Sequence, residues 1–183
     1  MQNQKTLIVL CGFMGCGKTT LGKALAARLG YAFADTDDML LADTGMTLAQ
    51  IFAAGGEPLF RDLEHETVRR AAALQNTVLS TGGGVMTFAR NAQLLAQSGE
   101  IIHVRRSFDA CCSAVLQRKN RPIAGTKTRE ELLDMYNARL AAYERCAVFT
   151  AYNDGAIDEA VEQILTHLRS RAGTEGIPNT SDS

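Results

Sequence analysis

Short apolar segments alternate with longer amphipathic segments along most of the chain. Each apolar segment is bounded by turn-forming or polar residues, which is typical of buried strands, and these segments lie at 6–11, 32–35, 77–80, 100–104 and 148–152. Between them, helical spacing of the apolar residues predicts helices at 18–29, 36–42, 47–54, 58–74, 89–97, 107–118, 128–145 and 156–169.

The alternation predicts the fold class. Strands separated by helices need crossover connections, which favour a parallel sheet buried on both faces. We therefore expect a three-layer α/β domain at 1–171, with a five-stranded parallel sheet flanked by helices. Residues 172–183 are polar and show no periodicity, so they are expected to form a flexible tail. Ligands of such sheets bind at the carboxyl ends of the strands, which directs attention to the residues just after each strand.

A phosphate-binding motif follows the first predicted strand. Residues 12–19, GFMGCGKT, match the pattern G-x-x-x-x-G-K-[ST] and lead into a predicted helix. The glycines allow backbone N–H groups to converge on phosphate oxygens, and the start of the helix adds partial positive charge. In this motif Lys18 reaches the β- and γ-phosphates, and the hydroxyl of Thr19 binds Mg²⁺. The sequence therefore predicts a site for ATP and Mg²⁺.

The motif alone does not name the reaction, because motors, GTPases and small-molecule kinases share it. No N-K-x-D guanine motif is present, and acids at a strand end occur only in the segment DTDD at 35–38. If extended geometry continues through Asp37, Asp35 and Asp37 point the same way. One carboxylate could then hold the metal and the other could accept a proton from an attacking hydroxyl. The alternative is that these acids cap the following helix, which is the role expected for Asp38.

Further candidates lie later in the chain. Arg61 and Glu64 are spaced to share one helical face, and taken alone they read as a surface ion pair. After the third strand, Gly82, Gly83 and Gly84 allow the backbone to approach a ligand closely. Residues 118–122, RKNRP, form a compact basic segment, and one helical face carries both Arg139 and Tyr143.

With these segments in order, the chain resembles the shikimate kinases, which are small P-loop kinases related to the nucleoside-monophosphate kinases. The resemblance rests on GFMGCGKTT at 12–20, DTD at 35–37, IFAAGGEPLFRDLE at 51–64, STGGG at 80–84, RPIAG at 121–125 and RLAAY at 139–143. These segments span nearly all of the predicted domain.

The resemblance implies a P-loop NTPase fold with acceptor-binding helices, a short lid, and transfer of the γ-phosphoryl group of ATP to the 3-hydroxyl of shikimate. It implies nucleotide contacts from the phosphate loop and the lid, at Gly15, Cys16, Gly17, Lys18, Thr19, Thr20, Arg118 and Arg121. It implies Mg²⁺ ligands at Thr19 and Asp35, shikimate contacts at Asp37, Arg61, Gly82, Gly83, Gly84 and Arg139, and catalytic roles for Lys18, Asp37 and Arg121. Two arginines suit one carboxylate, which a planar guanidinium can grip with two hydrogen bonds.

Two segments depart from the family pattern. The lid between Arg118 and Arg121 is short for the family, and residues 150–155, TAYNDG, lack the arginine and proline that many members place around adenine.

The sequence also allows two alternative functions. One alternative is a kinase for another small hydroxy acid such as gluconate. The other is a catalytically silent kinase-like domain that binds nucleotide or shikimate for regulation.

Net charge and composition restrict the classes of binding partner and the cellular location that we expect. The formal net charge is -1, which gives no electrostatic reason to expect nucleic acid or a membrane surface as a partner. The first apolar run is too short for a signal peptide or a membrane span, so a cytoplasmic location is expected. The protein is also expected to be a monomer. Five cysteines and three histidines lack the spacing of a metal site, and the cysteines are interpreted as small apolar residues.

Overall fold

The computed structural model describes residues 6–117 and 127–174, with side chains as far as residue 171. In this part of the chain a single parallel sheet of five strands has the order β2-β3-β1-β4-β5. Its strands are β1 (Leu7–Cys11), β2 (Ala32–Asp35), β3 (Thr77–Ser80), β4 (Gly99–Arg105) and β5 (Phe149–Tyr152). The predicted strands and the predicted parallel sheet are confirmed, and β4 is longer than predicted at both ends.

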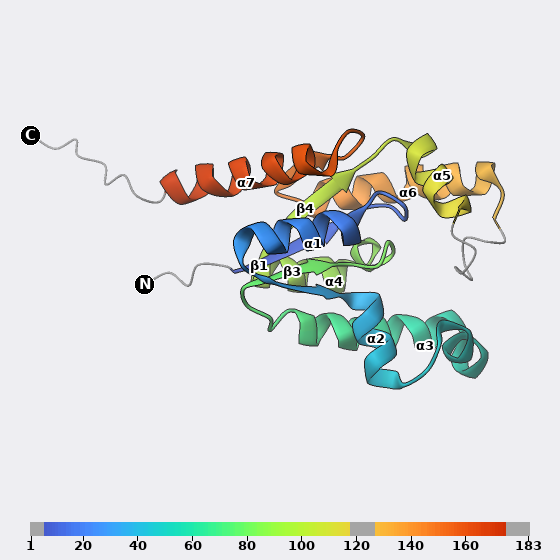
Figure 1. The fold of residues 1–183 in the computed structure, drawn as a ribbon. Coiled ribbons are helices and arrows are strands. Elements are labelled where there is room, and N and C mark those ends of the chain that lie inside the picture. The colour runs from blue at the N-terminus through green and yellow to red at the C-terminus, as the bar shows by residue number, and fades with distance from the viewer. Residues whose placement is uncertain (1–5, 118–126, 175–183) are drawn as a thin grey trace, which may run out of the picture.

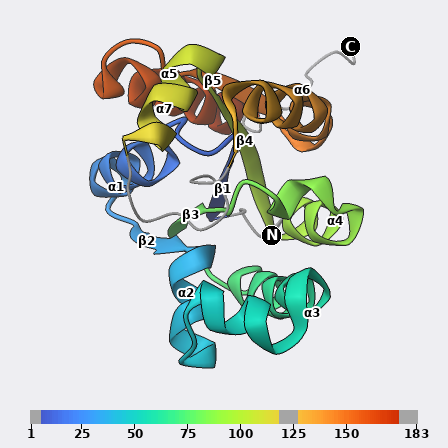
Figure 2. The same ribbon diagram turned by 90° about the vertical axis from the view of Figure 1, so that its right-hand side faces the viewer.

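Helices cover both faces of this sheet, as the predicted three layers require (Figures 1 and 2). Helices α1 and α7 pack together on one face, while α4 and α6 pack against β4 on the other. Helices α2 and α3 pack together beside the sheet, at the end of β2. The helices span α1 (Lys18–Leu29), α2 (Thr36–Thr44), α3 (Leu48–Ala71), α4 (Ala89–Ser98), α5 (Phe108–Leu116), α6 (Arg129–Cys146) and α7 (Ile157–Thr174).

The central position of β1 explains its composition. Every residue of this strand is buried, because β3 and β4 flank it and helices cover both its faces, whereas β2 at the sheet edge is only partly buried. The large side chains of Leu7, Leu10 and Leu79 are fully buried in this core. Burying one such side chain stabilises the folded state by about 1.5–3 kcal/mol.

A second, smaller core lies between α2 and α3. It consists of Leu40, Ile51 and Phe60, with partly buried apolar side chains packed around them. This cluster is separate from the core around the sheet, so the lobe formed by α2 and α3 has its own apolar centre.

Helix α3 replaces two predicted helices. A capping box starts it, because the Thr47 side chain accepts a hydrogen bond from the Gln50 backbone and the Gln50 side chain accepts one from the Thr47 backbone. The helix kinks at Gly56, whose φ of 65° is left-handed and suits glycine. Pro58 follows in the first turn after the kink, where its missing N–H costs little. The two helices predicted at 47–54 and 58–74 are therefore the two halves of α3 on either side of this kink, and the second half ends at Ala71, three residues earlier than predicted.

Other differences concern boundaries. Helix α7 continues to Thr174, past residue 171 where the sequence placed the end of the domain, and the later tail residues lie outside the described ranges. A short 3₁₀ helix, η1 (Val85–Thr87), was not predicted. None of the described helices combines the length and the apolarity that a membrane span needs.

Candidate active site

The phosphate loop lies between β1 and α1 at the carboxyl end of the sheet. Gly12, Gly15 and Gly17 have φ values of 147°, 80° and 95°, which L-residues with a side chain rarely adopt. Space is equally restrictive, because a Cβ on Gly12 would lie 2.4 Å from the carbonyl oxygen of Val104 and one on Gly15 would lie 2.5 Å from that of Cys111. The motif glycines are therefore required by both backbone conformation and packing.

Lys18 folds back over its own loop. Its ammonium group donates hydrogen bonds to the carbonyl oxygens of Gly12 at 2.8 Å and Phe13 at 3.0 Å, and the residue is only 8% exposed. It also lines the cavity above the loop. The positive charge thus lies at the phosphate cradle, satisfied by backbone oxygens of the protein.

Cys16 turns its side chain away from this cavity. Its sulfur is buried and lies 3.7 Å from the Lys18 ammonium nitrogen, and Cys16 is not one of the residues that line the cavity. Any contact of Cys16 with a nucleotide would therefore use its backbone. Glycine at position 12 accommodates this thiol, since a Cβ there would lie 2.9 Å from the sulfur.

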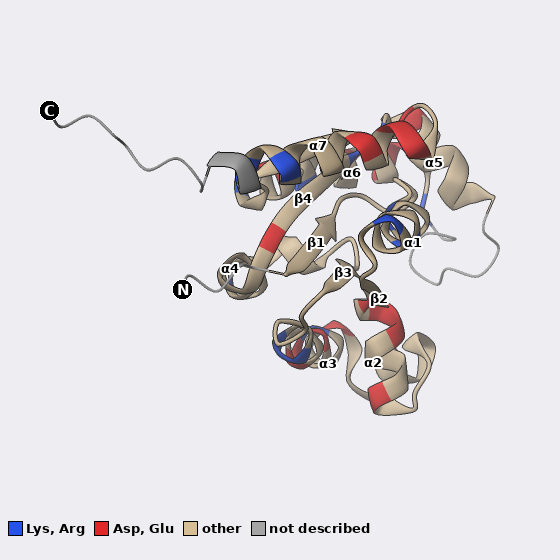
Figure 3. Ribbon diagram, turned by 60° about the vertical axis from the view of Figure 1, so that its left-hand side comes forward, with Lys and Arg blue, Asp and Glu red and all other residues tan. Residues whose placement is uncertain are grey.

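Asp35 has two partners, one for each carboxylate oxygen. Oδ1 accepts a hydrogen bond from the Asp37 backbone N–H at 2.9 Å and caps α2, while Oδ2 accepts one from the Thr19 hydroxyl at 3.3 Å. The strand ends at Asp35 and α2 begins at Thr36, so the condition that extended geometry continues through Asp37 is not met. Asp37 is instead brought to the cavity by the first turn of α2, the red turn directly after β2 in Figure 3. The N-cap is Asp35, and the expected capping role of Asp38 was wrong.

The glycine loop at 82–84 is held in place by hydroxyl groups. The Gly82 N–H donates to the Thr36 hydroxyl at 2.9 Å, and the carbonyl oxygens of Gly83 and Gly84 accept hydrogen bonds from Tyr143 and Thr87, each at 2.6 Å. Thr36 is buried and was not singled out from the sequence. Its only sequence signal was its place between two acids of the DTD segment.

The glycines of this loop have no side chains, which leaves room for the predicted acceptor residues. A Cβ on Gly82 would lie 2.7 Å from Asp37 Oδ1, and one on Gly84 would lie 2.8 Å from Arg61 Nη1.

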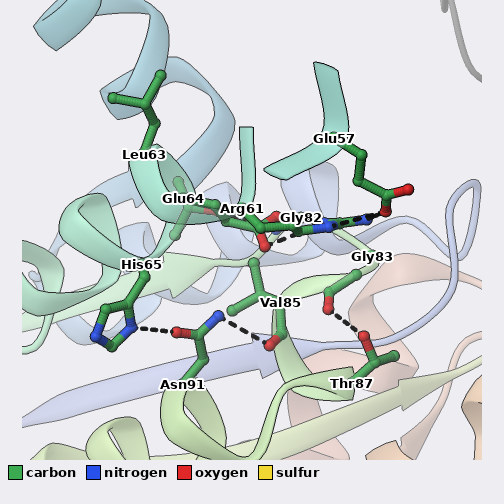
Figure 4. A network of polar contacts seen from close by, with 12 residues as sticks. Glu57, Arg61, Leu63, Glu64, His65, Gly82, Gly83, Val85, Thr87 and Asn91 are labelled. Carbon is green, nitrogen blue, oxygen red and sulfur yellow. Dashed lines mark hydrogen bonds and ion pairs between the residues drawn. The ribbon is translucent and has the colours of Figure 1, made fainter. Parts of the chain in front are cut away.

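A hydrogen-bonded link joins α3 to the turn after the loop. The side chain of Asn91 donates to the Val85 carbonyl at 3.2 Å, and its Oδ1 atom lies 2.7 Å from Nδ1 of His65 (Figure 4).

Arg61 is recessed and held by two carboxylates. Its guanidinium donates to Glu57 at 3.0 Å and to Glu64 at 3.1 Å (Figure 4). Its central carbon lies over the rings of Phe60 and Phe88, at 4.9 and 5.0 Å from their centroids. The Arg61 side chain is 16% exposed and that of Glu64 only 4%. The reading of this pair as a surface ion pair was therefore wrong. Burial raises the pKa of Glu64, and the nearby Arg61 charge opposes that rise.

Arg139 and Tyr143 lie on one face of α6, as their spacing predicted. Nη1 of Arg139 would be 3.4 Å from a Cβ on Gly83, and the arginine lines the same cavity as Arg61. Burial raises the pKa of Tyr143 well above its ordinary range, so this side chain remains a neutral hydrogen-bond donor to Gly83.

Two cavities meet in this region. One, of about 220 Å³, is lined by the phosphate loop, Thr19 and Asp35, and the other, of about 590 Å³, is lined by Arg61, Glu64 and Arg139. The walls of both cavities include Met14, Asp37, Gly82 and Gly83. The predicted lid residues Arg118 and Arg121 lie outside the described part of the chain.

A phosphate cradle joined to a second, arginine-lined cavity defines an ATP-dependent phosphotransferase that acts on a small acceptor. The family model described as shikimate kinase matches residues 14–169. This chain belongs to the shikimate kinase family.

Individual relatives agree with this membership. The chain is 38% identical over 163 residues to a shikimate kinase from Pelotomaculum thermopropionicum, an alignment that covers 88% of this chain and 95% of the relative. Its fold matches the shikimate kinase from Acinetobacter baumannii in complex with shikimate, with a TM-score of 0.86, 32% identity and coverage of 92% and 95%. The structure of the Bacteroides thetaiotaomicron shikimate kinase matches with a TM-score of 0.81, 31% identity and coverage of 90% and 98%.

Proposed function

We propose that this chain transfers the γ-phosphoryl group of ATP to the 3-hydroxyl of shikimate, giving shikimate 3-phosphate and ADP. The observation that carries the proposal is the position of Asp37, which lines both the phosphate cavity and the arginine-lined cavity. A carboxylate at that junction can accept the proton of a hydroxyl as it attacks a phosphoryl group. The relative from Acinetobacter baumannii whose fold matches this chain was solved in complex with shikimate.

The second cavity suits a small molecule with one carboxylate. Arg61 and Arg139 supply two guanidinium groups, and a guanidinium matches the planar geometry of a carboxylate with two parallel hydrogen bonds. Glu57 and Glu64 fix Arg61 in one orientation, which lowers the entropy lost when it binds a ligand. The backbone at Gly82, Gly83 and Gly84 completes this wall and is proposed to contact the acceptor.

The phosphate cavity suits the triphosphate. Backbone N–H groups at 15–20 and the ammonium group of Lys18 would contact the phosphates, with Lys18 exchanging its bonds to Gly12 and Phe13 for phosphate oxygens. Arg118 and Arg121 remain proposed as lid residues that bind ATP, and Arg121 as a catalytic residue, by the family pattern alone.

The oxygen donors beside the cradle fit Mg²⁺. Thr19 and Asp35 offer a hydroxyl and a carboxylate side by side, which are ligands that this ion prefers in combination with phosphate oxygens and water. Across the ranges 6–117 and 127–171, no group of three or more His, Cys, Asp or Glu side chains is arranged to hold a metal ion, so these two residues are the proposed protein contribution. A magnesium ion bound there would offset the negative charge of the phosphates during transfer.

An assay of ADP release with ATP and Mg²⁺ tests the proposal. Shikimate, quinate and gluconate would be compared as acceptors at equal concentrations. We expect turnover with shikimate far above that with the other two acids. Turnover with gluconate and none with shikimate would reassign the acceptor, and nucleotide binding without turnover on any of the three would favour a silent regulatory domain. We also propose that the protein is a monomer, and light scattering coupled to size-exclusion chromatography tests that state.

A further inference from the structure

Two neighbouring strand ends each place a side chain on the phosphate loop. Nη1 of Arg106, just after β4, donates a hydrogen bond to the Gly15 carbonyl at 3.1 Å. Nδ2 of Asn153, just after β5, donates to the Cys16 carbonyl at 2.7 Å. Two consecutive carbonyls of the loop are therefore held by side chains that are distant in sequence.

The two strand ends are themselves fixed to each other. The Asn153 N–H donates to the Arg105 carbonyl at 2.8 Å, and the Ser107 N–H donates to Asp154 at 2.9 Å. That hydrogen bond from Ser107 lowers the pKa of Asp154, which keeps the carboxylate charged. From α6, Tyr136 donates to the Arg106 carbonyl at 2.9 Å. The backbone that carries Arg106 and Asn153 is thus anchored on several sides.

Asn153 is buried beside the loop, and Arg106 is partly buried there. Asn153 is 3% exposed, and a Cβ on Gly17 would lie 2.5 Å from its Nδ2 atom. Both residues line the phosphate cavity. Among the residues that the structure describes, the buried atoms Nε of Arg106 and Oδ1 of Asn153 have no hydrogen-bond partner. In the described part of the chain, the side chain of each residue therefore makes one hydrogen bond, and its acceptor is a carbonyl of the loop.

The direction of these carbonyls matters for phosphate binding. A phosphate cradle requires successive N–H groups that point into the cavity, and a free loop of glycines has many other conformations. Fixing the carbonyls of Gly15 and Cys16 restrains the peptide planes at 15–17. Lys18 also holds the carbonyls of Gly12 and Phe13, but those bonds must be released when the ammonium group turns to phosphate. The bonds from Arg106 and Asn153 can persist.

We propose that Arg106 and Asn153 are positioning residues that hold the phosphate loop in its nucleotide-binding conformation. They act through the Gly15 and Cys16 carbonyls, so the free energy needed to order the loop is supplied by the fold before ATP arrives. The guanidinium of Arg106 also adds a fixed positive charge to the wall of the phosphate cavity.

The test measures nucleotide affinity directly. Arg106→Met keeps the length of the side chain without its donors, and Asn153→Asp keeps its shape but replaces the donor with a second oxygen. Calorimetry with ADP and Mg²⁺ is expected to show a Kd raised about tenfold or more in each variant, with a parallel rise in KM for ATP. At saturating ATP, kcat should change by less than the KM. Arg106→Lys, which can still donate one hydrogen bond to Gly15, should recover part of the affinity.

Arg105→Met is the matched control. Arg105 is the adjacent arginine, but its side chain pairs with Glu144 at the surface at 3.0 Å, so its loss should leave ADP affinity unchanged. Thermal unfolding identifies variants that do not fold, and affinity is compared at a temperature where each is folded. Unchanged ADP affinity in folded Arg106→Met and Asn153→Asp would overturn the proposal, as would equal losses of ADP and shikimate affinity. Because ADP binding does not depend on the acceptor, this outcome is separate from any failure of the proposed acceptor.

Discussion

The hydroxyl of Thr19 and the carboxylate of Asp35 lie 3.3 Å apart, although Thr19 is in the first turn of α1 and Asp35 ends β2. The other oxygen of Asp35 caps α2 through the Asp37 N–H. One carboxylate therefore serves both the proposed metal site and the helix that carries Asp37.

Two substitutions of Asp35 separate these roles. Asparagine also caps helices well, so Asp35→Asn should leave the free energy of unfolding nearly unchanged while raising the Mg²⁺ concentration needed for half-maximal turnover. Asp35→Ala loses the cap as well, and its unfolding free energy should fall by about 1 kcal/mol. Denaturant unfolding and Mg²⁺ titration of turnover measure the two effects. An unchanged Mg²⁺ requirement in Asp35→Asn would remove this residue from the metal site.

Asp37→Asn tests the proposed proton acceptor. The substitution keeps the size and hydrogen-bonding reach of the side chain but removes its charge, so kcat should fall about a hundredfold or more while KM for shikimate changes less. Asp43→Asn is the control on the same helix, because Asp43 pairs with Arg70 instead of lining either cavity. Loss of shikimate affinity with kcat preserved would show that Asp37 only orients the acceptor.

Arg61→Ala should weaken shikimate binding roughly 10- to 100-fold and leave ADP affinity unchanged. It also leaves Glu64 buried without its partner, so the free energy of unfolding should fall by about 2–4 kcal/mol. The double variant Arg61→Ala/Glu64→Gln should recover much of that stability but none of the affinity. Arg69→Ala is the control, because Arg69 pairs with the exposed Glu66 on the same helix. If calorimetry instead showed a loss of ADP affinity with shikimate affinity unchanged, Arg61 would belong to the nucleotide site and not to the acceptor site.

The buried His103 is expected to make the free energy of unfolding fall at acidic pH. It is 2% exposed in β4, and burial lowers its pKa from 6.5 to about 4. The folded state therefore favours the neutral ring, and the stability that this residue contributes is present above pH 6.5 and is lost as the pH falls toward 4. The loss amounts to about 3 kcal/mol, at 1.36 kcal/mol per pKa unit.

His103→Phe provides the measurement. It keeps an aromatic ring beside Tyr143, whose ring centroid lies 5.3 Å from that of His103, and removes the titration. Denaturant unfolding at several pH values between 7 and 4 should show a shallower loss of stability in the variant than in the wild type. Parallel curves for the two proteins would contradict the role of His103.

The sequence predicted the sheet and the phosphate loop well because both depend on local patterns. Strands of a parallel sheet form short apolar runs between polar or turn residues, and the cradle needs glycines at fixed spacing. The partly buried strand at 32–35 and the buried strand at 77–80 were both predicted with the bounds that the structure shows. The positions of Arg61 and Arg139 in one cavity followed from the family pattern, and the structure brings them together.

The parts that sequence reasoning missed depend on contacts between distant segments. Nothing in the local sequence around Arg106 or Asn153 indicates that they meet the phosphate loop, and the buried Thr36 shows its role only beside Gly82. The double use of Asp35 was missed because capping and metal binding were treated as alternatives. Each carboxylate has two oxygens, and here they face different partners.

The separate core of Leu40, Ile51 and Phe60 bears on how this enzyme can change over time. Arg61 belongs to the lobe that this core supports, whereas the phosphate loop is built on the core around the sheet. Mutations in this smaller core can reshape the wall that carries Arg61 without replacing residues of the larger core, to which the C-terminal part of α3 contributes Val68 and Ala71. Acceptor preference can therefore drift among descendants of this chain while ATP use is inherited unchanged.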